Sequence, residues 1–441
     1  MTKRIALISF GCAKNLVDSE VMLGCLDRAG YSFAARPEEA DIIVLNTCGF
    51  IQPARDEAEA GIRRALRLKG QDPGKRVVVA GCYVQRSRKA LARAYPGVDA
   101  WLDVGQFDKI TETLDGRPAA ASHATFLYSH LSPRIVSTPP GWAYLKISEG
   151  CSHECAFCSI PRIKGPYRSR PMDSIVREAR RLASLGVKEI NLVSQDTTFY
   201  GRDLGMKDGL AKLVQKLLGV RGIAWFRILY GYPEEITDAL LEVMGDRRVC
   251  PYLDIPFQHA DSRLLRSMKR SMDAARGLRL IAKVRRLVPD IALRTSLIVG
   301  FPGEGRAEFG RLQDFVRRAA FDHLGVFTYS PEEGTSAFHL GDPVSEPVKQ
   351  RRRASLMSLQ AEISRRNNVK YRGRTLDVLL DRISPRDPGR ASGRGRFQAP
   401  EVDGRITVRT SPLQAADFVQ TVRQVEITAA GVYDLRGKLK G

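Results

Sequence analysis

Three cysteines lie within eight residues of one another in the stretch "GCSHECAFCS". Cys151, Cys155 and Cys158 have the spacing C-x3-C-x2-C, and no fourth cysteine follows nearby. Thiolates are the usual protein ligands of iron–sulfur clusters, and ferredoxin-type patterns close a [4Fe–4S] cluster with four of them. Three thiolates hold three irons and leave the fourth iron open to a small molecule. The spacing therefore predicts a [4Fe–4S] cluster that binds a ligand.

Zinc is the alternative metal for these cysteines, with His153 or a distant residue as the fourth ligand. Structural zinc sites usually combine two separated pairs of ligands. His153 lies between two of the cysteines, where its side chain could hardly reach the same ion. The spacing therefore favours an iron–sulfur cluster over zinc.

A second group of cysteines is spread along the first hundred residues. Cys12, Cys48 and Cys82 each follow a short apolar run, in "RIALISFGC", "DIIVLNTC" and "RVVVAGC", and each precedes a helical stretch. Parallel strands end at one edge of a sheet, so these residues can converge there. The nearby helix N-termini should lower the thiol pKa values and favour thiolates. We therefore expect a second three-cysteine [4Fe–4S] cluster.

The other two cysteines occupy different positions. Cys25 falls in the middle of a helical stretch, and Cys250 precedes Pro251 before a strand, so we expect both to be structural. Free cysteines are often small buried hydrophobes, which is also the alternative for the second group. Three cysteines at equivalent strand-to-helix turns argue against it. Disulfides are not expected in a cytosolic chain.

The elements that must position these residues follow an α/β pattern. Residues 1–125 alternate apolar runs with helical stretches, which predicts a doubly wound α/β domain, and residues 126–141 have the composition of a linker. Residues 142–370 repeat the strand–helix unit six times, which predicts a TIM-like or partial β/α barrel with its chemistry at the strand C-termini. Residues 371–441, including a strand at 396–402, predict a small all-β barrel.

Length and charge limit the classes of function. A chain of 441 residues predicts two or three domains. Its net charge of +21 would attract polyanions such as RNA, although arginine-rich solvated faces would give the same charge. No apolar run is long enough to cross a bilayer, and the apolar run at the N-terminus has the pattern of a strand. We expect a cytoplasmic protein.

The local cysteine group resembles the radical S-adenosylmethionine superfamily, because C-x3-C-x2-C follows the first barrel strand and Phe157 precedes the last cysteine. The resemblance implies that the amino and carboxylate groups of S-adenosylmethionine chelate the open iron. It also implies that an electron, from a flavodoxin or ferredoxin type of donor, cleaves the cofactor to a 5'-deoxyadenosyl radical. By their position, five side chains are expected to line the cofactor pocket: Gln195, Asp196, Arg294, Thr295 and Ser296. The alternative is that they are ordinary polar residues at strand ends.

The whole chain resembles the methylthiotransferase family of radical S-adenosylmethionine enzymes. Two open clusters are followed by a region in which "GRFQAPEVDGRITV" and "VYDLRG" resemble a TRAM-type barrel. The resemblance implies that the N-terminal cluster supplies or carries sulfur, while one cofactor molecule gives a methyl group and another gives the radical. A C–H bond would become C–S–CH3. No catalytic residue beyond the cluster ligands is assigned.

Local motifs resemble the branch of this family that modifies an aspartate β-carbon in ribosomal protein S-twelve. They are "GCAKNLVDSE", "NTCGFIQPARDEA", "YLDIPFQHA" and "TYSPEEGTSA", with Ala13 in place of the usual proline. The partner implied is that protein, free or on the ribosome. Arg294 or Arg227 would then bind the acidic substrate side chain, and the TRAM-like barrel could contact RNA.

Two other functions remain open at this point. One is methylthiolation of an adenosine in tRNA, by the other branch of the same family. The other is a non-catalytic RNA-binding or ribosome-binding protein in which the clusters are structural, because a fold does not by itself fix a function.

Overall fold

The computed structural model describes residues 3–117, 126–410 and 420–440. The N-terminal part is a parallel sheet in the order β2-β1-β3-β4-β5. Apolar clusters lie on both faces of this sheet, because strands such as β4 bury nearly every residue. The elements are β1 (Arg4–Ser9), α1 (Ala13–Arg28), β2 (Ser32–Phe33), β3 (Ile42–Thr47), α2 (Gln52–Gln71), β4 (Arg76–Gly81), α3 (Cys82–Ala94), β5 (Ala100–Leu102) and α4 (Ile110–Leu114).

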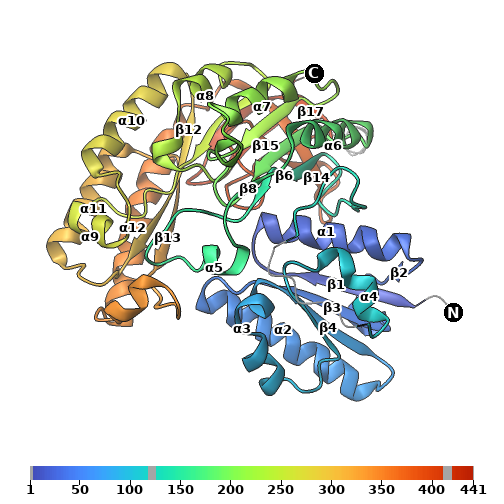
Figure 1. Cartoon of the computed structure of the whole chain (residues 1–441). Coiled ribbons are helices and arrows are strands. Elements are labelled where there is room, and N and C mark those ends of the chain that lie inside the picture. The colour runs from blue at the N-terminus through green and yellow to red at the C-terminus, as the bar shows by residue number, and fades with distance from the viewer. Residues whose placement is uncertain (1–2, 118–125, 411–419, 441) are drawn as a thin grey trace.

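The central part is a six-stranded parallel sheet in the order β13-β12-β11-β10-β9-β6, an open row with helices on its outer face (Figure 1). This confirms the prediction of a partial β/α barrel. Its strands are β6 (Trp142–Lys146), β9 (Glu189–Val193), β10 (Trp225–Ile228), β11 (Val249–Asp254), β12 (Ala292–Val299) and β13 (His323–Thr328). A two-stranded ribbon of β7 (Ser148–Glu149) and β8 (Arg168–Ser169) encloses the cysteine loop.

Polar side chains fix where several barrel helices begin. Thr237, Asp261 and Asp273 accept hydrogen bonds from backbone N–H groups in the first turns of α8, α9 and α10. The helices of this part are α5 (Ile160–Lys164), α6 (Met172–Ser184), α7 (Gly209–Leu218), α8 (Asp238–Val243), α9 (Ser262–Ser267), α10 (Ala274–Leu287), α11 (Arg306–Ala319) and α12 (Glu346–Val369).

The C-terminal part is a closed barrel in the order β14-β15-β16-β18-β17, as predicted. The strand predicted at 396–402 is wrong, because the chain turns there: Gln398 N–H donates to the Gly395 carbonyl oxygen at 3.1 Å, and Gln398 Oε1 accepts from Gly395 N at 3.0 Å. The strands are β14 (Thr375–Ile383), β15 (Arg390–Gly395), β16 (Ile406–Arg409), β17 (Val422–Ala430) and β18 (Leu435–Leu439).

The β-barrel packs against the inner face of the six-stranded sheet, behind the strands in the view of Figure 1. Tyr252 OH on β11 donates to Asp403 Oδ2 at 2.8 Å, and Arg394 Nη1 on β15 lies 2.7 Å from Glu189 Oε2 on β9. Trp142, the first residue of β6, belongs to the same buried apolar cluster. These contacts fill the part of the inner face near the strand N-termini, opposite the end that carries the cysteine loop.

The segment predicted as a linker, 126–141, is a strap of mostly half-buried residues that is held by a few buried side chains. Arg134 Nη2 lies 2.6 Å from Glu20 Oε2 on α1, and its Nη1 lies 2.5 Å from Glu178 Oε1 on α6. All three side chains are almost fully buried. The boundary predicted at residue 125 falls outside the described residues. Among the described helices, none is both long and apolar enough to cross a lipid bilayer.

Candidate metal centres and cofactor pocket

The local cysteine group lies on a loop that follows β6 and β7, at the C-terminal end of the first barrel strand. Gly150 precedes Cys151 with φ +81°, and a Cβ there would lie 2.1 Å from the Pro166 carbonyl oxygen, so only glycine fits this turn. The N–H of Cys158 donates to the Cys155 carbonyl oxygen at 3.0 Å. The loop therefore folds back on itself and gathers its three thiols.

A buried arginine contacts this loop. Arg270 Nη1 lies 3.6 Å from Cys155 Sγ, its Nη2 donates to the Pro256 carbonyl oxygen at 2.8 Å, and its guanidinium lies 3.9 Å from the Tyr232 ring centroid. Its Nε is buried without a hydrogen-bond partner among the described residues. Hydrogen bonds to the sulfurs help set the potential of an iron–sulfur cluster, so Arg270 is placed to tune one. Sequence reasoning missed this residue, since no spacing marks it.

His153 is held away from the thiols. Its ring stacks on Tyr232 at 3.7 Å, and its Nε2 lies 2.6 Å from Asp196 Oδ2. The other oxygen of Asp196 accepts from Thr198 N at 2.9 Å and from Thr198 Oγ1 at 2.6 Å. Asp196 therefore uses both oxygens to fix this loop. His153 interacts with Asp196 and Tyr232, which does not favour its use as a zinc ligand together with the cysteines.

Two of the other side chains predicted to line the cofactor pocket have polar atoms that could bind a ligand. Gln195 Nε2 donates to Glu149 Oε1 at 3.2 Å, while its Oε1 is buried without a partner among the described residues. Ser296 is half-buried on β12. Thr295 is fully buried and donates to the Ile255 carbonyl oxygen at 2.8 Å. A role for Gln195 and Ser296 at the cofactor stays a prediction that this geometry allows.

Two arginines suggested for the substrate lie on the inner face of the barrel. Arg294 Nε is 3.6 Å from Asp254 Oδ1, and its Nη1 is 3.4 Å from Asp403 Oδ1, so it faces the β-barrel more than the cysteine loop. Arg227 is fully buried, and its Nε donates to Glu189 Oε1 at 2.8 Å. The suggestion for Arg227 is wrong, because its guanidinium is used inside the interface between the barrels.

The second cysteine group lies at three adjacent strand-to-helix turns. Cys12 caps α1, Cys48 follows β3 and Cys82 begins α3. A Cβ on Gly11 would lie 2.7 Å from Cys48 Cβ, and a Cβ on Gly49 would lie 3.0 Å from the backbone carbon of Cys82. The turns thus touch one another in series. Residues 70 positions apart in sequence meet at the edge of one sheet.

Burial dominates the chemistry of the free thiols. It raises the pKa of Cys82 and that of Cys158 to about 12, and it also raises the pKa of Cys48. The prediction that helix N-termini lower these pKa values is therefore wrong for Cys48 and Cys82. Desolvation of a charged sulfur outweighs the partial charge of the helix end. Coordination to a metal removes the proton outright, so these thiols suit a metal better than free nucleophilic chemistry.

The spacing of the side chains can be compared with what a cluster needs. Among residues 3–117, 126–410 and 420–440, no three His, Cys, Asp or Glu side chains are arranged to hold one metal ion. A [4Fe–4S] cluster binds each cysteine at a different iron, so its ligands stand farther apart than those of a single zinc ion. Each group supplies three sulfurs, and the donor set fits such a cluster.

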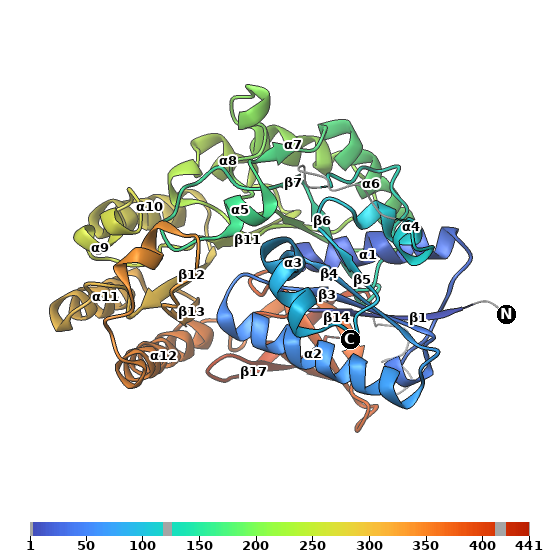
Figure 2. The same ribbon diagram turned by 60° about the horizontal axis from the view of Figure 1, so that its bottom comes forward.

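A buried ionic network connects the two centres. Lys146 on β6 binds Asp18 on α1 and lies 2.6 Å from Glu149 Oε2, while Lys164 on α5 lies 3.0 Å from Asp18 Oδ2. Burial acts to raise the pKa of Glu149, but the ammonium groups of Lys146 and Lys164 hold it at about 2. Glu149 is two residues from Cys151, and Lys164 acts electrostatically on Cys82. The network therefore links the segments that carry the two cysteine groups, and α5 lies beside α3 (Figures 1 and 2).

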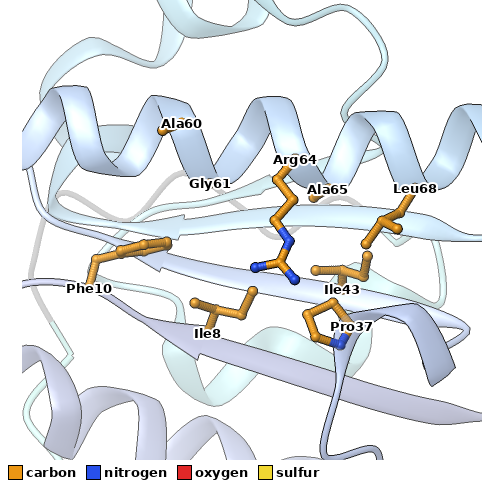
Figure 3. A pocket seen from close by; sticks show the side chains of 9 residues that line it. All are labelled: Ile8, Phe10, Pro37, Ile43, Ala60, Gly61, Arg64, Ala65 and Leu68. Carbon is orange, nitrogen blue, oxygen red and sulfur yellow. The ribbon is translucent and has the colours of Figure 1, made fainter.

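A separate cavity of about 270 Å³ lies between the N-terminal sheet and α2 (Figure 3). Arg64 is the one charged residue that lines it, and no cysteine does. The cavity therefore belongs to neither centre. Its lining is Ile8, Phe10, Pro37, Ile43, Ala60, Gly61, Arg64, Ala65 and Leu68.

Comparison with known families and structures matches all three parts. Residues 4–103 match the uncharacterized protein family UPF0004, residues 145–316 the radical SAM superfamily and residues 373–439 the TRAM domain. Among solved structures, the radical S-adenosylmethionine methyltransferase TsrM from Kitasatospora setae aligns with a TM-score of 0.54 at 14% identity, over 74% of this chain and 73% of that one. At this identity the likeness concerns the fold alone.

Curated relatives align over almost the whole chain. The ribosomal protein uS12 methylthiotransferase RimO of Symbiobacterium thermophilum is 45% identical over 99% of this chain and 90% of its own length. Those of Aquifex aeolicus and Pelobacter propionicus are 43% and 42% identical, over 99% of this chain and 97% and 98% of their own lengths. The family resemblance read from the cysteines is thereby confirmed. The chain belongs to the RimO family of radical S-adenosylmethionine methylthiotransferases.

Proposed function

We propose that this enzyme adds a methylthio group to the β-carbon of an aspartate in ribosomal protein uS12. The observation that carries the proposal is the pairing of two three-cysteine groups across one buried ionic network, in a chain whose full-length relatives are named for that reaction. When bound, S-adenosylmethionine and two [4Fe–4S] clusters supply the radical, the methyl group and the sulfur that turn a C–H bond into C–S–CH3.

The ligand roles follow from position. Cys151, Cys155 and Cys158 hold the cluster that binds S-adenosylmethionine, and Cys12, Cys48 and Cys82 hold the auxiliary cluster. Each set binds through three sulfurs and leaves one iron for a small ligand.

Gln195 Oε1 and the Ser296 hydroxyl are available as polar contacts for the cofactor, whereas Asp196 acts by orienting His153. Arg294 faces Asp254 and Asp403, and Thr295 is fully buried and donates to the Ile255 carbonyl oxygen, so we do not propose either as a contact for the cofactor. The cofactor contacts proposed are therefore fewer than the sequence suggested.

Aromatic side chains enclose the cysteine loop. The ring of His153 lies 5.5 Å from that of Phe199, whose ring lies 5.0 Å from that of Tyr167, and the ring of Tyr232 stacks on that of His153. A reactive radical is quenched by stray hydrogen donors and water, so a packed wall of this kind protects it. The task of these residues is shielding and orientation.

A contact with RNA is a further part of the proposal. The TRAM domain matches residues 373–439, and the net charge of +21 favours association with a polyanion. This fits a substrate that sits on the ribosome in the cytoplasm, with a flavodoxin or ferredoxin type of protein as electron donor. The same two observations favour the second candidate function, which is methylthiolation of tRNA.

Activity of the anaerobically reconstituted enzyme on three separate substrates would decide between them. Free uS12, assembled small ribosomal subunits and bulk tRNA are each incubated with S-adenosylmethionine and a reductant, and products are analysed by mass spectrometry. We expect a methylthio mass gain on an aspartate of uS12 and none on tRNA. Cys151→Ala and Cys12→Ala serve as controls that should abolish it. Modification of tRNA alone would overturn the proposal.

A further inference from the structure

Lys14 reaches from the N-terminal domain to the end of a barrel strand. It stands in the first turn of α1, two residues after Cys12, and its Nζ lies 3.3 Å from the ring centroid of Tyr230. Tyr230 follows the C-terminal end of β10. The ammonium group therefore lies where the auxiliary cysteines and the barrel rim meet.

The backbone under this contact is constrained. Tyr230 has φ +62°, a left-handed conformation that non-glycine residues seldom adopt and that often marks a functional site. Its carbonyl oxygen accepts from Thr197 N at 2.8 Å, and Gly231 N donates to the Asp254 carbonyl oxygen at 2.7 Å. These bonds fix the turn and hold the phenol ring beneath Lys14.

Among the residues that the structure describes, no carboxylate forms an ion pair with Lys14. Its ammonium group contacts the Tyr230 ring, while Asp254 lies beside Arg294. No acidic residue stands in the first turn of α1, whose free N–H groups add positive potential.

We propose that Lys14 binds the side-chain carboxylate of the aspartate that is methylthiolated, and so makes the site selective for an acidic residue. This inference rests on the proposed function. The β-carbon of aspartate is directly bonded to the carboxylate carbon, so a group that holds the carboxylate fixes the reacting carbon as well. A cation next to Cys12 holds it beside the cluster that carries the sulfur.

Binding selectivity tests the assignment. The dissociation constant of the anaerobic holoenzyme is measured for uS12 and for uS12 in which the modified aspartate, located by mass spectrometry, is replaced by asparagine. A charge-assisted hydrogen bond predicts roughly a tenfold or greater preference of the wild type for the aspartate form. Lys14→Gln should reduce this preference to about onefold, and Lys14→Arg should retain most of it.

Arg28→Gln is the matched control, because Arg28 is an exposed cation at the other end of the same helix, and it should keep the full preference. A Lys14→Gln enzyme that still prefers aspartate overturns the inference. So does a loss of N-terminal iron in that variant with selectivity intact, which would assign Lys14 to the cluster. Failure of the proposed function differs, because the wild type itself would then leave uS12 unmodified.

Discussion

Arg270 shows how one side chain can set the properties of a metal centre. Its guanidinium touches the Cys155 sulfur, is fixed by a backbone carbonyl and lies over the Tyr232 ring. A cation beside a cluster stabilises the reduced, more negative state. At the proposed cluster, Arg270 would thus favour the electron transfer on which cofactor cleavage depends.

Removing this charge should make the cluster harder to reduce. We expect Arg270→Gln to lower the midpoint potential of the cluster proposed at Cys151, Cys155 and Cys158, as measured by redox titration followed by electron paramagnetic resonance. Arg270→Lys keeps the charge and should shift the potential less. A Cys12→Ala background removes the signal of the auxiliary cluster. An unchanged potential in Arg270→Gln would contradict this role.

The turns between strands and helices decide whether distant cysteines meet. Gly11 and Gly30 both have positive φ values, but a Cβ on Gly11 would strike Cys48, whereas a Cβ on Gly30 would meet nothing within 4 Å. Both glycines need a positive φ, but only the position of Gly11 is crowded. Alanine substitutions at the two positions therefore distinguish the effect of backbone strain from that of a steric clash with Cys48.

We expect Gly11→Ala to lose the auxiliary cluster, so that reconstituted protein holds about four irons per chain in place of about eight. Gly30→Ala carries a similar backbone penalty and should keep both clusters. Iron analysis and the absorbance of the reconstituted protein measure the result. Full iron content in Gly11→Ala would show that the turn can shift away from Cys48.

The ionic network between β6, α1 and α5 also holds separate elements together. Lys146 is fully buried, and Lys146→Met leaves Asp18 and Glu149 short of a counter-charge in the interior. Breaking one member of such a network costs about 3–5 kcal/mol. Anaerobic urea unfolding should show this loss, and Asp18→Asn added to Lys146→Met should recover part of it. Additive losses would mean that the two residues act independently.

Across the whole molecule, Glu189 joins the two barrels through Arg227 and Arg394. Although burial acts to raise it, the two guanidinium groups hold the pKa of Glu189 below its ordinary value of 4.5. The stabilisation is therefore fully present above about pH 4.5 and is lost as the pH falls through the lower folded pKa.

Glu189→Gln should accordingly lower the unfolding temperature at neutral pH, because it leaves two buried guanidinium groups without their counter-charge. The difference from the wild type should shrink as the pH falls from about 4.5 toward the lower folded pKa, because the carboxylate of the unfolded wild type takes up a proton first and that of the folded protein follows. Scanning calorimetry of both proteins across this range measures it. A difference that stays constant with pH would exclude the ion pairs as its cause.

The sequence predicted what local patterns can encode. The cysteine spacing, the strand-end positions of Cys48 and Cys82, and the α/β order of the elements were readable because each depends on neighbours in the chain. The pair of Lys146 with Asp18 joins residues 128 positions apart, and no local signal announces it. The strand expected at 396–402 failed because one glutamine side chain closes a turn within an otherwise β-like run.

The strap formed by residues 126–141 restricts how a target can approach. If α1 and α6 moved apart, the buried ion pairs of Arg134 with Glu20 and Glu178 would break. Opening and closing of the N-terminal domain against the barrel is therefore costly, and we expect the two parts to keep a fixed relative position. A substrate segment must therefore reach the two cysteine groups without separation of the N-terminal domain from the barrel.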